Sequence, residues 1–361
     1  MEATRVSDAF EVKSHAGPYQ VTLDEDAANK IFAGEGKPFH VIVDRRVANL
    51  HGDYLARLLS EDSILAIDAS EPSKSLERFP DYVTHLVGKG IRRDHQLLAI
   101  GGGIIQDITC FLAANMLRGI QWTMMPTTLL AQADSCIGSK SSINSGGAKN
   151  ILGTFTPPHA VWVATRFLDT LAEPDIRSGV GEMLKVHAIE GPSHFDRISS
   201  DYEKIFTQRA TMIRYIKESL LIKRQYIELD EFDRGIRNVF NFGHSFGHAI
   251  EAATNFAIPH GIAVTIGMDM ALEVGHELGI TNMSTLKRMR PVLRRNAEGY
   301  RSIPVPLDAF LAALSKDKKN TGSGTATVIL PRGDGAIEKF TIPTDERFRR
   351  VCTNYFESVD K

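Results

Sequence analysis

Cysteine is scarce in this sequence, which contains only Cys110, Cys136 and Cys352 and no CxxC spacing. Three widely separated cysteines argue against a disulfide framework and against a thiolate metal site. An excess of one charge is also missing, because 42 Lys and Arg residues stand against 44 Asp and Glu residues, for a formal net charge of -2. Without a general basic field we expect no nucleic-acid partner, and any anion site has to be local.

Long apolar runs are absent as well. No stretch approaches the roughly 20 apolar residues that a bilayer-spanning helix requires, and residues 1–15 lack the apolar core of a signal peptide. We therefore expect no membrane partner and a cytoplasmic location. The composition that remains, 43% hydrophobic and 24% charged, is that of an ordinary globular protein.

Two domains are expected, because a chain of 361 residues exceeds the usual size of one hydrophobic core. The first part alternates helical patterns with β-rich runs at residues 39–43, 63–67, 96–100 and 121–125, which predicts a parallel sheet. Later, apolar residues recur with helical spacing around 181–190, 209–228, 239–254 and 261–278. The sequence thus predicts an α/β domain over residues 1–165 and a mainly helical domain over residues 166–361, with a small hairpin within residues 327–342.

A glycine-rich loop follows the predicted strand at residues 96–100. Gly101, Gly102 and Gly103 precede a helical pattern that includes Gln106 and Asp107. Glycines at a helix N-terminus let the backbone approach a phosphate, so this loop is a dinucleotide-binding candidate. It lacks the GxGxxG fingerprint, and a purely structural turn is an equally good interpretation. Asp44 ends another predicted strand, where it could bind a ribose or serve as a turn residue.

A polar segment with several glycines follows residue 126. It carries Asp134, Lys140, Asn144, Lys149 and Asn150. Ammonium and amide groups on a loop that a ligand can approach suit a phosphate or a polyol. The alternative is an ordinary solvated loop, since loops are normally polar.

The predicted helical half contains a candidate metal site. Glu182 and Lys185 lie three residues apart on one helix face, a spacing that is commonly a surface ion pair. His244 and His248 lie four apart, which stacks them on one face and suits a metal or a shared anion. His260 opens the next helical pattern, where a lone histidine is usually a cap or a surface residue.

Glycine is frequent beside these histidines. Gly243 and Gly247 lie within the same short stretch as His244 and His248 and lower its helix propensity. They indicate close packing or the approach of a ligand.

Together these segments resemble the 3-dehydroquinate synthase family of sugar phosphate cyclases. The resemblance runs, in order, through GGGIIQD (101–107), LRG (117–119), PTTLLAQADS (126–135), the Lys140 loop, AKNILGTF (148–155), SGVGEMLK (178–185), DEFDRGIRNVFNFGHSFGHAIE (230–251), PHG (259–261) and DKKN (317–320). It implies a Rossmann-like NAD-binding domain followed by a mainly helical metal-binding domain.

The resemblance also implies site residues. The family's zinc ligands correspond to Glu182, His244 and His260, with Co²⁺ as a possible substitute. The matching NAD contacts are Asp44, Glu71, Lys74, Gly102, Gly103, Asp107, Thr127, Thr128, Lys140, Lys149 and Thr170. The matching sugar phosphate contacts are Asp134, Lys140, Asn150, Lys185, Lys223, Arg237, Asn241, His248 and Lys318. Arg118 corresponds to an arginine that reaches the phosphate site of a neighbouring subunit, which implies a homodimer.

The implied reaction is the conversion of 3-deoxy-arabino-heptulosonate 7-phosphate to 3-dehydroquinate and phosphate. It runs through transient oxidation by NAD, elimination of phosphate, reduction, ring opening and an intramolecular aldol step. Two departures from the family pattern bear on the substrate. Gln106 replaces a glycine, which could crowd the cofactor or be absorbed by a small backbone shift. Residues 138–144 read GSKSSIN where the family has GGKTAVN.

These departures keep other hypotheses open. A divergent cyclase could act on sedoheptulose 7-phosphate or glucose 6-phosphate in cyclitol or secondary-metabolite synthesis. A metal-dependent polyol dehydrogenase shares the two-domain plan, although the KN and DKK blocks argue against it. A hypothesis of another class is a noncatalytic protein that binds a sugar phosphate or a nucleotide. The complete zinc triad argues against it, because such a binding protein has little need for one.

Overall fold

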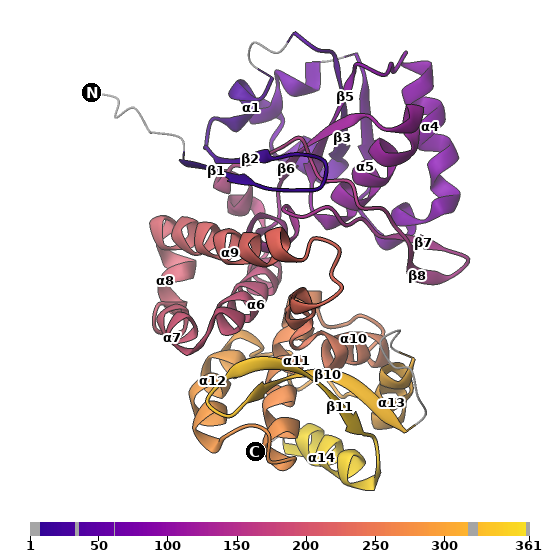
Figure 1. Cartoon of the computed structure of the whole chain (residues 1–361). Helices are drawn as coiled ribbons and strands as arrows, with labels where there is room; N and C mark the ends of the chain where they lie inside the picture. Colours follow the sequence, from indigo (N-terminus) through magenta and orange to yellow (C-terminus); the bar gives the residue numbers. More distant parts are fainter. Residues whose placement is uncertain (1–7, 33–35, 61, 317–323, 359–361) are drawn as a thin grey trace. The chain divides into compact units, whose positions relative to one another are not determined.

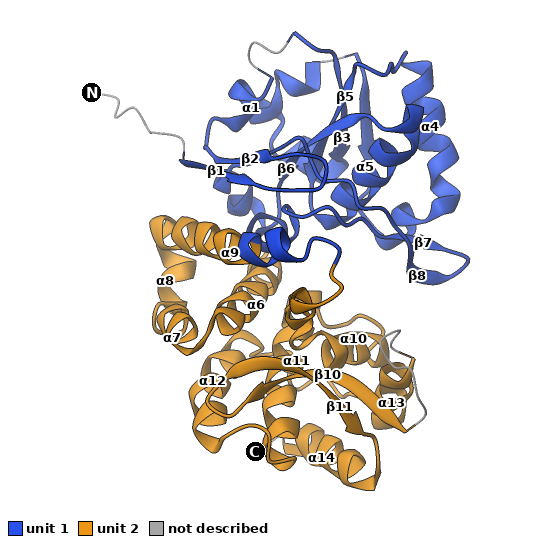
Figure 2. Ribbon diagram, viewed as in Figure 1, with its two compact units in different colours: residues 1–171, 224–232 blue, residues 172–223, 233–361 orange. Residues whose placement is uncertain are grey.

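The computed structural model describes residues 8–32, 36–60, 62–316 and 324–358, and the chain divides into two compact units (Figure 2). Unit 1 comprises Met1–Leu171 and Arg224–Phe232, and unit 2 comprises Ala172–Lys223 and Asp233–Lys361. The C-terminal end of one long helix, from Arg224 onward, therefore belongs with unit 1, a grouping that the sequence did not indicate. The predicted division after residue 165 stays a prediction.

Unit 1 contains a seven-stranded sheet with the order β1-β2-β9-β6-β5-β3-β4. Only β1 and β2 pair antiparallel, and all the other neighbours are parallel. The strands are β1 Asp8–Val12, β2 Tyr19–Leu23, β3 Phe39–Asp44, β4 Ile64–Ile67, β5 Gln96–Gly101, β6 Gln121–Pro126 and β9 Ala160–Val163. The four predicted strands and the predicted α/β class are confirmed.

Helices and turns connect these strands. The helices are α1 Ala27–Lys30, α2 Arg45–Leu50, α3 Gly52–Leu55, α4 Phe79–Gly88 and α5 Gly103–Asn115. The 3-10 turns are η1 Leu58–Ser60, η2 Glu71–Lys74, η3 Leu76–Arg78, η4 Met116–Arg118 and η6 Thr165–Thr170, and η5 Ala131–Ser135 is a π-helical turn. A small antiparallel hairpin, β7 Ile143–Ser145 with β8 Ala148–Leu152, lies within the predicted polar loop.

The centre of the sheet is apolar on both faces, as a parallel sheet covered by helices requires. On one face, Val41 and Val43 of β3 and Leu98 and Ile100 of β5 are fully buried in one cluster, and on the other face Ile42 of β3 is fully buried. Burial of these side chains is the main favourable term in forming the sheet.

The strand order reverses between β3 and β5. From β3 the chain passes to β4 on one side and then returns to β5 on the other side. In open α/β sheets, ligands bind beyond the carboxyl ends of the strands at such a reversal. Asp44 and Gly101 end these two strands, so the glycine loop lies where a ligand site is expected.

Unit 2 is mainly helical, as predicted (Figure 1). Its helices are α6 Glu173–Glu190, α7 Pro192–Ser200, α8 Tyr202–Thr207, α10 His244–Ala253, α11 His260–Glu277, α12 Met283–Asn296, α13 Leu307–Ser315 and α14 Glu346–Glu357, and η7 Ile236–Asn241 is a 3-10 turn. Helix α9, Arg209–Leu229, is shared between the units. The predicted hairpin is confirmed as β10 Thr325–Arg332 and β11 Ala336–Pro343.

Helix α11 forms the core of unit 2, because its side chains are buried from Gly261 to Leu272 without a break. A helix that is apolar all round has to be enclosed by other elements. It packs against α6, α10, α12, α14 and β10.

Glycines set the spacing of three of these helices. A Cβ on Gly261 of α11 would overlap the Ser178 carbonyl of α6, and a Cβ on Gly267 would overlap the Gly243 carbonyl before α10. The predicted close packing at Gly243 and Gly247 is thus confirmed, since Gly247 also lies against the backbone of α11. The backbones of α6 and α10 can approach α11 closely only because side chains are missing at these positions.

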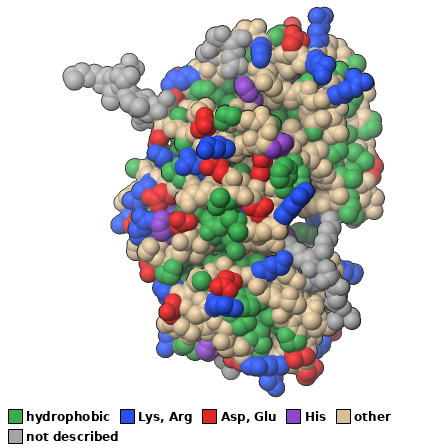
Figure 3. Space-filling model, viewed as in Figure 1, with side chains coloured by type: hydrophobic (Ala, Val, Ile, Leu, Met, Phe, Trp, Pro, Cys, Tyr) green, Lys and Arg blue, Asp and Glu red, His purple; other side chains and the backbone are tan. Residues whose placement is uncertain are grey.

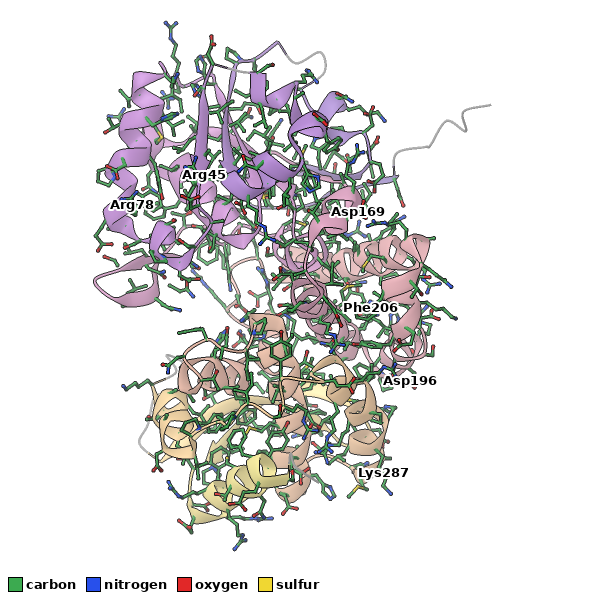
Figure 4. All side chains as sticks on the ribbon, turned by 180° about the vertical axis from the view of Figure 1, so that it is seen from behind. Arg45, Arg78, Asp169, Asp196, Phe206 and Lys287 are labelled. Carbon is green, nitrogen blue, oxygen red and sulfur yellow. The ribbon has the colours of Figure 1, made fainter. Side chains whose placement is uncertain are left out.

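The surface carries charges of both signs, and acidic and basic side chains are interspersed on the face in Figure 3. Arg45, labelled in Figure 4, places its Nε 2.9 Å from Asp68 Oδ1 and donates from Nη2 to the Ala66 carbonyl, which links the start of α2 to the end of β4. Among the described helices, none combines the length and the apolar character needed to cross a bilayer.

Candidate functional site

The glycine loop of unit 1 leaves room at a helix N-terminus. Gly102 is the N-cap of α5, and a Cβ on Gly102 would meet Thr128 Cγ2 at 2.9 Å. A Cβ on Gly103 would meet no atom within 4 Å, so the space before the first turn of α5 is open. Unpaired N–H groups at a helix N-terminus favour an anion. This loop fits the pyrophosphate of a dinucleotide.

Four polar side chains form a network beside this loop. Lys74 Nζ lies 3.1 Å from Asp107 Oδ2 and 2.9 Å from Asn150 Oδ1. Ser142 Oγ lies 3.2 Å from the same Asp107 oxygen and 2.9 Å from the same Asn150 oxygen, and the Ser142 N–H donates to Asp107 Oδ1. Burial raises the pKa of Asp107, and the ammonium of Lys74 opposes this shift. The network therefore joins η2, α5 and the β7–β8 hairpin.

Asn150 has a backbone conformation that few residues other than glycine adopt, with φ at +52°. Its N–H donates to Asn144 Oδ1 at 2.9 Å, and Asn144 Nδ2 in turn donates to Glu71 Oε2 at 2.8 Å. Left-handed residues of this kind concentrate at functional sites, where surrounding contacts hold them. The structure thus brings together Glu71, Lys74, Asp107 and Asn150 from the predicted set.

Gln106 contacts the turn that carries Asp134. Its Nε2 donates to the Ser135 carbonyl at 2.6 Å, and Ser135 Oγ donates back to Gln106 Oε1 at 2.9 Å. The side chain is buried in this contact, with 6% of the residue exposed. The residue that replaces a family glycine therefore links α5 to the π-helical turn η5.

The other predicted residues of unit 1 are spread more widely. Asp44 caps α2 by accepting from the Arg46 N–H, and Thr170 Oγ1 lies 2.8 Å from His51 Nε2. Lys140 and Lys149 are exposed. Thr127 is buried directly after β6, at the same sheet edge as the glycine loop. Arg118, in η4 after the C-terminus of α5, lies at the opposite edge, because α5 runs antiparallel to the strands.

The predicted metal ligands of unit 2 meet around one carboxylate oxygen. Glu182 Oε1 lies 3.4 Å from His260 Nε2 and 3.6 Å from His244 Nε2. A tetrahedral metal with bonds of about 2.0–2.2 Å holds its ligand atoms about 3.3–3.6 Å apart. His248 is close as well, since nitrogens of His244, His248 and His260 all lie within 4.8 Å of one another. The donor set and its spacing therefore fit a zinc-like cation.

The ring nitrogens that face away from this oxygen are also engaged. His260 Nδ1 lies 3.1 Å from Glu251 Oε2, and His244 Nδ1 lies 3.3 Å from the Phe242 carbonyl. Metal-binding histidines usually donate their second N–H to a carboxylate or a carbonyl, which fixes the tautomer and the ring orientation. Both histidines show this arrangement.

The Glu182–Lys185 pair is buried, unlike the surface ion pairs that this spacing commonly forms. Lys185 Nζ lies 2.5 Å from Glu182 Oε2, with 2% and 1% of the two side chains exposed. Burial alone raises the pKa of Glu182, but Lys185 and the two histidines hold it well below its usual value. Burial lowers the pKa of His260, whereas Glu182 and Glu251 raise it, to about 10. The same negative field that favours a proton there favours a metal cation.

Three helices position this cluster through the glycine contacts described above. Glu182 follows Gly181 on α6, and His260 precedes Gly261 on α11. A Cβ on Gly181 would overlap the Gly261 carbonyl, so the two ligands lie where the backbones of the two helices are in close contact. His244 is the first residue of α10, directly after the left-handed Gly243.

The remaining predicted residues of unit 2 are more scattered. Lys223 and Arg237 are both buried, with 7% of each residue exposed. Asn241 ends η7 and donates to the Asn238 carbonyl at 3.0 Å. Lys318 and the rest of the DKKN segment lie outside the described residues.

Several residues of these clusters had no predicted role. Glu251, Ser142 and Ser135 were part of quoted motifs without a function. Glu251 follows His248 by three residues on one helix face, so the helical spacing that drew attention to the histidines also marks it. No comparable signal distinguishes Ser142 or Ser135, because their partners are far away in the sequence.

Comparisons with known proteins agree with these features. The family model of the 3-dehydroquinate synthase N-terminal region matches residues 64–178, and the model of its C-terminal region matches residues 179–320. The chain is 36% identical to the 3-dehydroquinate synthase of Dictyoglomus turgidum over 282 aligned residues. The alignment covers 78% of this chain and 79% of that protein.

Solved structures of sugar phosphate cyclases have the same fold. A 2-epi-5-epi-valiolone synthase from Streptomyces hygroscopicus subsp. jinggangensis, with NAD⁺ and Zn²⁺ bound, matches with a TM-score of 0.82 and 25% identity over 94% of this chain and 97% of that one. A 2-deoxy-scyllo-inosose synthase complexed with carbaglucose-6-phosphate, NAD⁺ and Co²⁺ matches with a TM-score of 0.82 at 20% identity, over 95% and 99% of the two chains. At 20% identity, this second match shows only that the two proteins share a fold. This chain therefore belongs to the 3-dehydroquinate synthase family.

Proposed function

We propose that this chain is a 3-dehydroquinate synthase, which converts 3-deoxy-arabino-heptulosonate 7-phosphate to 3-dehydroquinate and phosphate. The observation that carries the proposal is the arrangement of Glu182, His244 and His260, with oxygen–nitrogen distances of 3.4 and 3.6 Å. A buried carboxylate and two oriented imidazoles are a catalytic rather than a structural donor set, because they leave coordination positions for a substrate. Membership of the family supports the same reaction.

Glu182, His244 and His260 hold the metal, and Glu251 orients His260. When bound, a divalent cation such as Zn²⁺ or Co²⁺ polarises a substrate hydroxyl so that the hydroxyl loses its proton more easily. Lys185 adds a buried positive charge beside Glu182, which stabilises negative charge that develops on nearby substrate oxygens. His248 lies next to the two histidine ligands, where it can contact the substrate.

NAD binds to unit 1, at the end of the sheet where the strand order reverses. Bound NAD accepts a hydride from the substrate and later returns it, so it is recycled rather than consumed. The glycine loop binds the pyrophosphate, and Asp44 accepts hydrogen bonds from a ribose. The predicted contacts that complete this site are Glu71, Lys74, Asp107, Thr127, Thr128, Lys140, Lys149 and Thr170.

Cationic and amide side chains hold the sugar phosphate. Lys140, Asn150, Asn241 and His248 bind the phosphate group, and the departing phosphate takes the proton from the carbon that was made acidic by oxidation. Arg237 and Lys223 pair with the substrate carboxylate, because a guanidinium binds a carboxylate through two parallel hydrogen bonds. Asp134, Lys185 and Lys318 contact the remaining substrate oxygens.

A homodimer and a cytoplasmic location complete the proposal. Arg118 lies at the sheet edge opposite to the glycine loop, so it is remote from the nucleotide site of its own unit 1. This placement supports a role in the phosphate site of a second copy of the chain.

A second candidate is a cyclase of the same family that acts on sedoheptulose 7-phosphate or glucose 6-phosphate. Residues 138–144 favour it, because their serines change the surroundings of Lys140. Ser142 joins the Lys74–Asp107–Asn150 network, and Ser139 Oγ is buried without a hydrogen-bond partner among the described residues.

The test is to incubate the purified chain with NAD and Zn²⁺ or Co²⁺ and with each of the three sugar phosphates in turn. Phosphate release is followed with time, and the product is identified by mass spectrometry. Release and dehydroquinate with the heptulosonate alone support the proposal, whereas a cyclised product only from another sugar phosphate establishes the second candidate.

Metal analysis of variants tests the ligand assignment separately. Glu182→Gln and His260→Ala are expected to lose both bound metal and turnover. Full metal content and activity in both variants would show that the metal ligands are other residues. A wild-type protein that takes up no divalent metal, and releases no phosphate, would favour a noncatalytic binding protein.

A further inference from the structure

The segment that carries Lys140 is one side of a short antiparallel ladder in unit 1. The backbone of residues 139–141 pairs with that of residues 154–156 through N–H···O bonds of 3.0 and 2.6 Å, and Lys140 lies opposite Phe155 between these bonds. Side chains alternate between the two faces of such a ladder, so Lys140 is exposed on one face and the two flanking serines are buried on the other. The backbone of the ladder therefore determines the position from which Lys140 acts.

A tyrosine 119 residues earlier in the chain holds the start of this ladder. The Gly138 N–H donates to the Tyr19 hydroxyl oxygen at 2.9 Å. Tyr19 is the first residue of β2 and is buried, with 4% of it exposed. Gly138 has φ at +106°, a conformation that glycine adopts readily. The chain thus turns into the ladder at the point where Tyr19 holds it, two residues before Lys140.

The other side of the ladder is connected to the same β1–β2 hairpin. The Phe155 and Phe232 rings meet edge to face with their centroids 5.0 Å apart, and the Phe232 ring centroid lies 5.3 Å from that of His15. His15, in the turn between β1 and β2, donates its N–H to Glu231 Oε2 at 2.7 Å and places Nδ1 2.9 Å from Glu231 Oε1. All of these residues belong to unit 1. The hairpin therefore contacts one side of the ladder directly and the other through Phe232.

The hydrogen bond from Gly138 bears on the position of Lys140. A backbone N–H that loses its acceptor has to find another one, so without the tyrosine hydroxyl the turn at Gly138 shifts. A displacement of about 1 Å in a group that contacts substrate can lower the rate about 100-fold, even when the substitution is far from the reacting atoms. Tyr19 itself lies before residue 64, where the match to the family model begins.

We propose that Tyr19 is a positioning residue for Lys140, and that it acts through the Gly138 N–H. The inference rests on the proposed function, in which Lys140 binds the phosphate group of the substrate. Tyr19 acts through the backbone of the ladder and not through contact with the substrate. The β1–β2 hairpin is thereby a supporting part of the phosphate site.

A double-mutant cycle of Tyr19→Phe and Lys140→Ala tests this assignment in the full-length protein with NAD and Zn²⁺. For each protein, kcat/KM for the heptulosonate phosphate and the dissociation constant of inorganic phosphate are measured. Tyr19→Phe is expected to lower kcat/KM about 10–100-fold and to weaken phosphate binding about 3–10-fold, because the ammonium of Lys140 is misplaced. In the Lys140→Ala background the same substitution is expected to change either quantity by less than about twofold, because no ammonium is left to misplace.

The matched control is Tyr54→Phe. The Tyr54 hydroxyl oxygen also accepts a backbone N–H, that of Ala28 at 3.2 Å, but it has no contact with the ladder among the described hydrogen bonds. This control is expected to keep the kcat/KM and the phosphate affinity of wild type. Urea unfolding is measured alongside. A Tyr19→Phe protein that is less stable but has wild-type kcat/KM and phosphate affinity would overturn the proposal, as would equal losses with and without Lys140.

The two measured quantities also separate this inference from the proposed function. Wild-type protein that binds phosphate but releases none from the heptulosonate phosphate would contradict the proposed function, and the phosphate-binding cycle would still decide the role of Tyr19. Active wild-type protein with additive effects of the two substitutions would contradict only the role of Tyr19. Wild-type protein that neither binds nor releases phosphate would overturn both.

Discussion

Residue Glu182 shows why charge and burial have to be judged from the folded chain. In the sequence it forms an ordinary i,i+3 pair with Lys185, and nothing local indicates that the pair is buried. Its other partners, His244 and His260, come from two different helices far along the chain. Helical spacing identified the histidine pair, and only the family resemblance joined Glu182 and His260 to it. The burial of Glu182 and its contacts with both histidines result from the packing of three helices, which no single segment of the sequence reveals.

Glu251 provides a prediction at the same scale. It holds His260 Nδ1 at 3.1 Å but does not reach the proposed metal position in the way that Glu182 does. Glu251→Gln is therefore expected to weaken metal affinity by about 10–100-fold without abolishing binding. Titration of the metal-free protein with Co²⁺, followed by its visible absorption, measures this change.

The matched control for Glu251 is Glu277→Gln, at the far end of α11 from His260. This control is expected to bind Co²⁺ like wild type. An affinity of Glu251→Gln within twofold of wild type would show that the hydrogen bond to His260 has no role in binding the metal.

His187 makes stability depend on pH. It is fully buried on α6, and neither ring nitrogen has a hydrogen-bond partner among the described residues. Burial, helped by His194 and Arg197, lowers its pKa to about 3. Between pH 6.5 and about 3 the unfolded chain binds a proton that the folded chain excludes, so the stability from this group is present above pH 6.5 and is lost as the pH falls.

The measurement is urea unfolding of wild type and His187→Leu at several pH values below 7. As the pH falls from 6.5 toward 3, the free energy of unfolding is expected to decrease more in the wild type than in the variant, by up to about 1.4 kcal/mol per pH unit. Parallel pH dependences in the two proteins would contradict the account.

Among the elements, those with a strong local pattern were predictable. Strands β3 to β6 are continuous apolar runs, and α6, α9 and α11 have helical periodicity. Strands β1, β2 and β9 were not predicted. Neither β1 nor β2 is a continuous apolar run, since β1 is largely exposed and β2 alternates apolar with polar residues. The β7–β8 hairpin was also not predicted, since its polar residues obtain their partners from η2 and α5. Gln106, a departure from the family pattern, proved to be a contact between α5 and η5.

The glycine contact between α6 and α11 leads to a prediction about packing. Gly261→Ala places a methyl group against the Ser178 carbonyl, so the helices have to separate. Overpacking of this kind costs about 1–3 kcal/mol, and the separation also moves His260 away from Glu182. We expect lower stability in urea unfolding together with weaker metal binding.

Gly88→Ala is the control for this substitution, because a Cβ at Gly88 meets no atom within 4 Å. Its free energy of unfolding is expected to stay within about 0.5 kcal/mol of wild type. If Gly261→Ala were equally neutral in stability and in metal affinity, the glycine contact would not be what positions the ligands.

For the whole molecule, the family followed from the order of many short motifs, and the two-domain class followed from the chain length and from the change from alternating to helical patterns. The proposed part of residues 138–144 in substrate choice could not be judged from the motifs, because Ser142 contacts Asp107, which is distant in the sequence. The proposed reaction draws on residues of both units, since the nucleotide residues lie in unit 1 and the metal ligands in unit 2. It also requires that NAD be regenerated in every turnover.

The most direct test of this account is to count the phosphate released per NAD when NAD is limiting. Purified protein is mixed with Zn²⁺, an excess of 3-deoxy-arabino-heptulosonate 7-phosphate and substoichiometric NAD, and phosphate and NADH absorbance are recorded together. The account predicts many phosphates released for each NAD and no accumulation of NADH. Accumulation of one NADH for each product formed, or no phosphate release by protein that has bound metal and NAD, would contradict it.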